Sequence, residues 1–267
     1  MDVQLAILCV LTFVIHLIGT LAYAVRIAGV RTRRIAVSFA LFNILVLISR
    51  TSNSFQGPFL AKRIEDNIRH GVAHGLLGDF RWLLLSATLA TVVGAFLIPT
   101  FQRIFSGAVR HFQVHRSIPQ LLMRGIFKGG LTQLKDAASL PAAENVTQLR
   151  IGHGTSYWIT LLNIIAVAFW TIGVFAALYA GYLNPELRVT SSTLSSVVNG
   201  LATIMMFVFI DPHMSVMTDD VMERKVPEAP FRKAIVWLVG SRIAGTLLAQ
   251  ALLVPAALFI VFIARSM

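Results

Sequence analysis

Charged residues are scarce in this sequence, and cysteine is nearly absent. Asp, Glu, Lys and Arg make up 13% of the 267 residues, about half of the roughly 25% that is usual in soluble proteins. Hydrophobic residues reach 56% and the mean hydropathy is +0.75, so a soluble globular protein is excluded and an integral membrane protein is indicated. The single cysteine, Cys9, excludes a disulfide framework and a cysteine-based zinc site.

Catalytic signatures are missing as well. The sequence contains no H-E-x-x-H pair, no G-x-S-x-G turn and no P-loop, the motifs that mark metalloproteases, serine hydrolases and ATP-driven motors. We therefore expect a protein that is not an enzyme and needs no cofactor or metal.

Basic residues exceed acidic ones, and the net charge is +11. Such an excess would suggest nucleic acid as the partner of a soluble protein, but in a membrane protein it indicates cytoplasmic loops that face anionic lipid. We expect contacts with anionic membrane lipids and no nucleic-acid partner. The oligomeric state stays open, a homodimer included.

Six apolar runs are long enough to cross a bilayer, whose core of about 30 Å needs roughly 20 helical residues. They are 2–26, 35–59, 81–103, 157–179, 188–211 and 234–264. The sequence thus predicts an all-α membrane protein with six transmembrane helices. The first run lacks a basic start and is too long for the core of a signal peptide, so we expect it to be retained.

Lysine and arginine are unevenly distributed between the two sides of these spans. Fifteen fall on one side: Arg26, Arg31, Arg33, Arg34, Arg103, Arg110, Arg116, Arg124, Lys128, Lys135, Arg150, Arg224, Lys225, Arg232 and Lys233. Six fall on the other: Lys62, Arg63, Arg69, Arg81, Arg188 and Arg265. Because cytoplasmic loops are enriched in these residues, we expect the first side in the cytoplasm and both termini outside.

The segment 101–154 alternates apolar and basic residues at helical spacing. Its first part sets Ile104, Phe105, Ala108 and Phe112 against Arg103, Arg110 and Arg116, and its second sets Leu121, Leu122, Ile126, Leu131 and Leu134 against Arg124, Lys128 and Lys135. The pattern predicts one or two amphipathic helices on the cytoplasmic face. Such an element anchors the chain to lipid, or it contacts a lipid head group.

The two halves of the chain resemble each other at an offset of about 156 residues. Asn43, Trp82 and Pro99 match Asn199, Trp237 and Pro255 in the second half. Since each half holds three helices, an odd number, the second half is inverted in the membrane. We expect one membrane domain built of a first repeat (1–100), the basic segment (101–154) and a second repeat (155–267), an architecture typical of alternating-access transporters.

Two arginines interrupt the spans, although a central arginine costs about 2.5–3.5 kcal/mol on insertion scales. Arg50 is 15 residues into its span and Arg242 eight residues into its own, roughly 22 Å and 12 Å along the helices. These depths predict that they lie in opposite halves of the membrane, each beside an internal cavity, and bind an anionic head group in turn. The alternative is a pair of buried arginines satisfied by backbone carbonyls or by Asp211.

Other polar residues within or beside the spans complete the set of candidates. Candidate substrate contacts are Arg26, Asn43, Asn53, Gln56, Asn199 and Gln250, and candidate coupling residues are His16 and Asp211. An interhelical hydrogen bond is the competing explanation for each amide. Asp219 and Asp220 are interpreted as a solvated turn in a cytoplasmic loop, and Gly57-Pro58, Asn184-Pro185 and Asp211-Pro212 as helix ends or breaks.

Six blocks spread in order over nearly the whole chain carry a family resemblance. They are TLAYAVRIAGVR (20–31), LFNILVLISRTSNSFQGPF (41–59), TIGVFAALYAG (171–181), NGLATIMMFVFIDP (199–212), SVMTDDV (215–221) and SRIAGTLLAQ (241–250). The chain resembles the Amj family of bacterial lipid II flippases, the alternates to the MurJ flippases. The resemblance covers Arg50 and Arg242 but not the basic segment.

The resemblance implies transfer of lipid II, the undecaprenyl-diphosphate-linked peptidoglycan precursor, from the cytoplasmic to the outer leaflet of the bacterial cytoplasmic membrane. This agrees with the residues, because a cationic, hydrated cavity spares a charged head group the cost of passing bare through hydrocarbon. Two other classes stay open: an intramembrane enzyme acting on a polyprenyl phosphate through Asp219-Asp220, and a small-ion or proton transporter that uses His16 and Asp211.

Overall fold

The protein is a bundle of long helices, shown in a computed structural model that describes residues 2–70, 75–115, 136–139, 141 and 156–267. Within these residues there are helices and no strands. Six helical segments are long and apolar enough to cross a membrane. The prediction of an all-α fold with six candidate spans is thereby confirmed.

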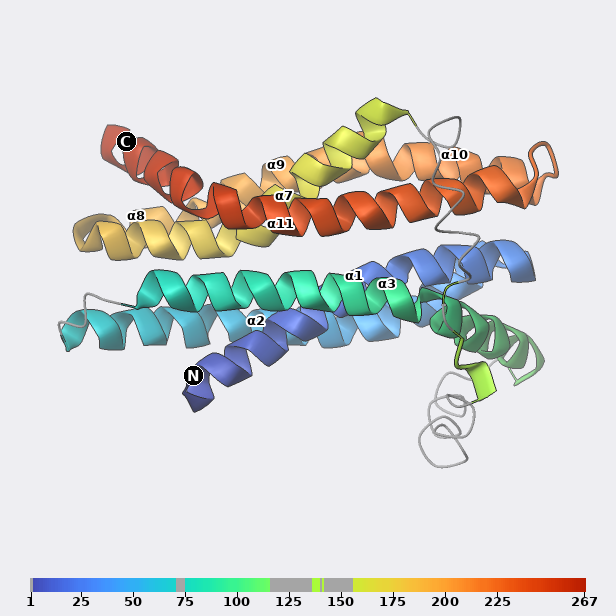
Figure 1. Cartoon of the computed structure of the whole chain (residues 1–267), viewed down its shortest axis with the longest axis horizontal. Helices are drawn as coiled ribbons and strands as arrows, with labels where there is room; N and C mark the ends of the chain where they lie inside the picture. The colour runs from blue at the N-terminus through green and yellow to red at the C-terminus, as the bar shows by residue number, and fades with distance from the viewer. Residues whose placement is uncertain (1, 71–74, 116–135, 140, 142–155) are drawn as a thin grey trace.

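The first half contributes α1 (Val3–Thr32), α2 (Ile35–Arg69) and α3 (Leu76–His115). Asp2 caps α1 by accepting a hydrogen bond from the backbone N–H of Leu5 at 2.8 Å, which satisfies one of the unpaired donors at the helix start. α1 packs against both α2 and α3. The three helices form the lower layer of Figure 1.

The second half begins with α7 (Tyr157–Leu183) and ends with α11 (Glu228–Ser266). The fifth span between them is a series of short helical segments. These are a 3₁₀ turn (Pro185–Leu187), α8 (Arg188–Thr193), α9 (Ser195–Met205), a π-helical segment (Met206–Ile210) and α10 (Asp211–Met222). α7 packs against α9 and α11, in the upper layer of Figure 1.

A buried cluster joins the two layers. The Phe80 ring on α3 packs against Phe175 and Tyr179 on α7, with ring centroids 6.1 Å and 5.5 Å away. Leu253 on α11 belongs to the same cluster. These buried rings pack the two halves of the chain against each other.

The helices are longer than the apolar runs predict, as α2 and α3 show. α2 passes through Pro58 and continues to Arg69, so the expected break at Gly57-Pro58 is wrong, and α3 extends on both sides of the run 81–103. The 40 residues of α3 measure roughly 60 Å, twice the hydrocarbon thickness. Hydropathy reports only the lipid-immersed part of a helix, whereas hydrogen bonding continues into water.

Ion pairs hold the extension of α2 in place. Arg63 contacts Asp79 at the start of α3 and Asp2 before α1, both at 2.7 Å, and Lys62 pairs with Asp66 one turn on. Some of the basic residues that the sequence assigns to the connection 62–80 therefore lie on α2 and form ion pairs.

Asp211-Pro212 marks a break between two helical segments and not the end of the span, because α10 begins at Asp211, continues to Met222 and carries Asp219 and Asp220. A proline inside a helix has no N–H to donate and crowds the preceding turn. The wider turns of the π-helical segment just before it provide the register change that a proline requires. Asp219 and Asp220 therefore lie on a helix rather than in a loop.

The amphipathic element is only partly visible. Residues 104–112 of its first stretch belong to the end of α3, where Phe105 is buried against Phe42. Arg116 and the second stretch, from Leu121 to Lys135, lie outside the described residues.

The two halves share several features that favour the inverted repeat, which stays a prediction. Pro99 lies inside α3 and Pro255 inside α11, and Figure 1 shows a bend in each helix. Ser86 on α3 donates a hydrogen bond to α1, and Ser241 on α11 accepts one from α7. The two serines are 155 residues apart, within one residue of the sequence offset.

Candidate functional site

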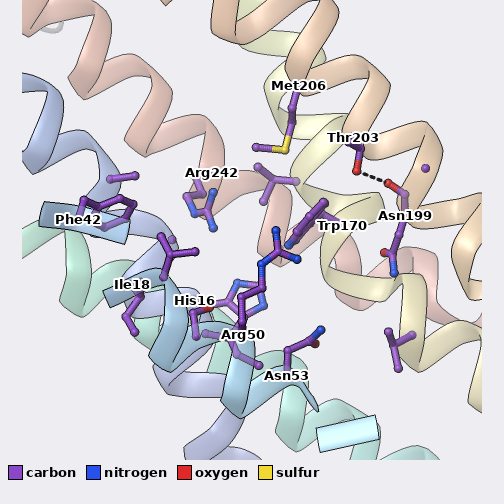
Figure 2. A pocket seen from close by; sticks show the side chains of 18 residues that line it. His16, Ile18, Phe42, Arg50, Asn53, Trp170, Asn199, Thr203, Met206 and Arg242 are labelled. Atoms are coloured by element: carbon purple, nitrogen blue, oxygen red, sulfur yellow. Dashed lines mark hydrogen bonds between the residues drawn. The ribbon is translucent and has the colours of Figure 1, made fainter. Parts of the chain in front are cut away.

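A cavity of about 430 Å³ lies among α1, α2, α7, α9 and α11. Its polar lining includes five of the predicted candidates, His16, Arg50, Asn53, Asn199 and Arg242, together with Ser49 and Thr203. Figure 2 shows the two guanidinium groups pointing into the cavity from opposite walls, with His16 near them. The described lining includes no carboxylate, so the two positive charges have no acidic counterpart there.

Arg242 forms the buried side of the cavity, with 8% of its surface exposed. Its guanidinium lies close to the side chain of Tyr23, and its Nε has no hydrogen-bond partner within the described part of the chain. The group passes close over α1 at Gly19, where a Cβ atom would lie 2.5 Å from Nη2. A side chain at this position would displace the Arg242 guanidinium, which is the flexible end of a long side chain.

Arg50 forms the accessible side of the cavity. Its side chain is exposed and reaches the cavity beside Trp170 (Figure 2). Asn53, almost one turn further along α2, is exposed and lines the same wall. The cavity therefore runs from an open side at Arg50 to a closed side at Arg242.

The two arginines lie at similar distances from the same end of the bundle, whereas the sequence predicts different depths for them. α11 begins at Glu228, earlier than the apolar run, so Arg242 is 14 residues from its start, and Arg50 is 15 residues from the start of α2. Both distances are roughly 21–22 Å, and both helices start from the same end of the bundle (Figure 1). The error arose from taking the first apolar residue as the helix start.

Asn199 lies on the α9 wall of the cavity. Its amide packs against Gly173 of α7 so closely that a Cβ atom there would clash. Thr203 donates a hydrogen bond to the Asn199 carbonyl at 2.7 Å, so the Asn199 side chain is not the acceptor. The amide remains directed at the cavity (Figure 2).

His16 is buried beside the arginines, with 5% of its surface exposed. Its Nδ1 has no hydrogen-bond partner among the described residues, and its carbonyl accepts a hydrogen bond from Thr20. Among the described residues, Nδ1 of the imidazole is therefore left free to bind a ligand or a proton.

The other candidates do not line the cavity. Arg26 pairs with Asp211 at 2.8 Å, Gln56 donates a hydrogen bond to Thr12, and Asn43 is exposed on α2. Gln250 is engaged with Arg81, whose guanidinium donates to both its carbonyl and its side chain. Apart from Asn43, these groups connect helices within and between the two halves, as the competing explanation for the amides expects for Gln56 and Gln250.

Sequence reasoning missed three residues of this site. Gly19 and Gly173 permit the close approach of Arg242 and Asn199, and Tyr23 lies beside the Arg242 guanidinium. A glycine inside a predicted helix was the available signal, because glycine weakens a helix and needs a packing reason. The role of Tyr23 depends on contacts between helices that no local pattern reveals.

The polar groups of the site suit the binding of an anion. Within the described residues no group of three or more His, Cys, Asp or Glu side chains is placed to hold a metal. Two guanidiniums, two amides and an imidazole form a set of hydrogen-bond donors that matches a phosphate-bearing anion.

Comparison with known proteins gives two matches. The family model described as "Amj: Alternate to MurJ" matches residues 11–264. A protein of Bacillus subtilis (strain 168) named "Lipid II flippase Amj" is 36% identical over 263 residues, which covers 98% of this chain and 96% of that protein. No solved structure matches the chain.

Proposed function

The chain belongs to the Amj family, and from this premise we propose that it transfers lipid II from the cytoplasmic to the outer leaflet of the bacterial cytoplasmic membrane. The observation that carries the proposal is the convergence of Arg50 and Arg242 on one cavity whose described lining has no carboxylate. A diphosphate carries its acceptor oxygens on two phosphorus atoms, so two guanidinium groups can bind it at the same time.

The cavity reduces the main energetic barrier to transfer. Moving a charged group bare through hydrocarbon costs tens of kcal/mol by Born-type estimates. The diphosphate instead binds the two guanidiniums, and the sugar binds the amides of Asn53 and Asn199. The polyprenyl chain stays in the bilayer and passes the open side of the cavity at Arg50. An inside-negative potential favours outward movement of an anion by about 2.3 kcal/mol per charge per 100 mV.

The cavity must widen during transport. Its volume of about 430 Å³ is near the lower end of ordinary small-molecule pockets, which range over about 300–1,000 Å³. It accommodates the diphosphate but not the whole disaccharide-peptide head group. Alternating movement of the two halves exposes the arginines to each side, and His16 couples this movement to a proton.

The membrane orientation and the surrounding lipid complete the proposal. Both termini face outside, and the connections that follow α1, α3 and α10 face the cytoplasm, where their lysines and arginines contact anionic lipids.

The test is transfer of fluorescent lipid II in proteoliposomes. Lipid II is placed in both leaflets, and a membrane-impermeant reductant bleaches the accessible molecules; with the protein present, bleaching should proceed beyond the outer-leaflet half. Mass analysis of the recovered lipid should show no chemical change. Bleaching that stops at half would overturn the proposal, release of phosphate would favour the enzyme, and an ion current without lipid would favour the ion transporter.

A further inference from the structure

A second basic feature lies at one end of the bundle, where α1 turns into α2 and α10 turns into α11. A cavity of about 570 Å³ there is lined by Arg31, Arg33, Arg224 and Glu228 together with apolar residues. We refer to these four residues as the basic notch. This end carries the connections that the charge distribution assigns to the cytoplasm.

Two arginines of the basic notch adopt a backbone conformation that arginine disfavours. Arg33 has φ 53° and Arg224 φ 63°, and no other non-glycine residue in the described ranges has a positive φ. Each follows a helix end, and their N–H groups donate to the carbonyls of preceding residues. Glycine is the preferred residue at such a position, so ending the helix does not explain why arginine is there.

An apolar groove begins beside the notch and runs between α3 and α11. It has a volume of about 280 Å³ and a lining that includes Ile27, Phe96 and Val239. Arg31 lines both the groove and the notch, and Arg232 stands at the same end of the groove. A cationic recess for a head group and an apolar recess for a chain thus share one arginine.

Hydrocarbon can reach the groove sideways. The exposed residues Leu85, Leu89, Val93 and Phe96 follow one another along α3 at helical spacing, and Phe96 also lines the groove. In a protein that spans a membrane, such a stripe faces lipid. An acyl chain is therefore the apolar molecule available at this position.

The charge at the notch exceeds its local compensation. Glu228 lies 3.6 Å from Arg31 and 2.8 Å from Arg232, so one carboxylate serves two arginines. Arg33 and Arg224 have no carboxylate partner within salt-bridge distance among the described residues. The four arginines and one glutamate around the two recesses leave a surplus of positive charge.

We propose that the basic notch and the apolar groove together bind an anionic glycerophospholipid of the adjoining leaflet. The lipid phosphate contacts Arg31, Arg33 and Arg224, and one acyl chain fills the groove between α3 and α11. The site lies across α11 from the central cavity, because Arg242 lines that cavity while the next residue, Ile243, lines the groove. It does not depend on the identity of the transported lipid.

Retention of lipid by the purified full-length chain tests the proposal through native mass spectrometry. The protein in detergent is exposed to phosphatidylglycerol, phosphatidylethanolamine or undecaprenyl phosphate. The chain should retain phosphatidylglycerol about tenfold better than phosphatidylethanolamine, as expected for charge-assisted contacts to one additional anionic charge.

Two variants test the contacts with the lipid head group and those with the acyl chain separately. The double variant R33G/R224G suits the backbone and removes two charges, so it should fold normally and lose the preference for phosphatidylglycerol. The variant A95F fills the groove, which Ala95 lines, and should reduce retention of both phospholipids. The matched controls are R110Q on α3 and A251F on α11, exposed positions that line neither recess, and both should bind like the parent.

Each other outcome overturns the proposal. Equal retention of the two phospholipids, or an unchanged preference in R33G/R224G with a normal melting temperature, would leave the arginines as structural residues only. Retention of undecaprenyl phosphate alone would assign the recesses to the transported lipid. No retained lipid of any kind would leave the groove without an occupant.

Discussion

Arg50 and Arg242 are the residues on which the transport proposal depends most directly. We predict that R50Q and R242Q each lower lipid II transfer by an order of magnitude or more, because removal of a charged donor costs about 1.5–3 kcal/mol. Lysine keeps the charge and loses the bidentate contact, so R50K and R242K should retain part of the activity. Transfer is measured in proteoliposomes at matched protein content.

The control for both positions is R265Q, a change to an exposed residue at the end of α11. A purely structural arginine would behave differently: its glutamine variant would lose yield and melting temperature, and transfer per folded molecule would stay normal. Full transfer by a well-folded R50Q or R242Q would therefore remove that residue from the site.

Gly19 provides an independent test of the Arg242 position. A Cβ atom in G19A would lie 2.5 Å from Nη2 of Arg242, so the guanidinium must move although its charge is unchanged. We predict a clear loss of lipid II transfer by G19A. The matched control G240A, where nothing lies within 4 Å of the new Cβ, should transfer normally and gain up to about 1 kcal/mol from helix propensity.

At the scale of elements, the N-terminal cap of α1 has contacts outside the membrane whose strength depends on pH. The Leu5 N–H first, and then the Arg63 guanidinium, lower the pKa of Asp2 below its ordinary value of 3.8. The stabilisation is present above that ordinary value and is lost as the pH falls through the lowered pKa. The parent should therefore lose melting temperature on acidification, and D2N should lose less over the same range.

D2N is the informative variant because asparagine also caps helices well, so only the charge is removed. Melting is followed by intrinsic fluorescence from neutral pH to about pH 3. Identical pH profiles for the parent and D2N would show that the contacts of Asp2 with Leu5 and Arg63 contribute nothing to stability.

The sequence predicted which segments are helical better than where the helices end. All six spans were found because each needs a long apolar run, and the end of α7 at Asn184-Pro185 was correct. The extension of α2 past Pro58 was missed because polar helices held by ion pairs carry no hydropathy signal. For the site, the free-energy cost of an arginine inside a membrane span identified Arg50 and Arg242. Their similar distance from one end of the bundle, and the partners of Gln56 and Gln250, depend on how the helices pack, which the sequence does not show.

At the scale of the whole molecule, orientation is the first property to establish. Both chain ends lie toward the left of Figure 1, whereas the turns after α1 and α10 lie toward the right. We predict that alkaline phosphatase fused after Met267 is active and that a fluorescent protein fused there stays dark, because both ends face outside. The opposite pair of signals would reverse the assignment of the two sides and the direction of transport.

A fusion in the turn between α10 and α11, at Lys225, serves as the internal control for that experiment. It should give the reciprocal signals, since this turn lies at the opposite end of the bundle from Met267. Equal signals at both positions would indicate two populations with opposite orientation.

The hydrogen bond between Ser86 and residue 9 makes the protein suitable for site-directed labelling. Ser86 donates to the backbone carbonyl of Cys9 at 2.7 Å, so the contact does not involve the thiol. Replacing Cys9 with serine keeps this link between α1 and α3, and it removes the chain's one cysteine. Pairs of spin labels attached to new cysteines on α2 and α9 would then report, as changes in label separation, how far the two halves part while lipid is carried.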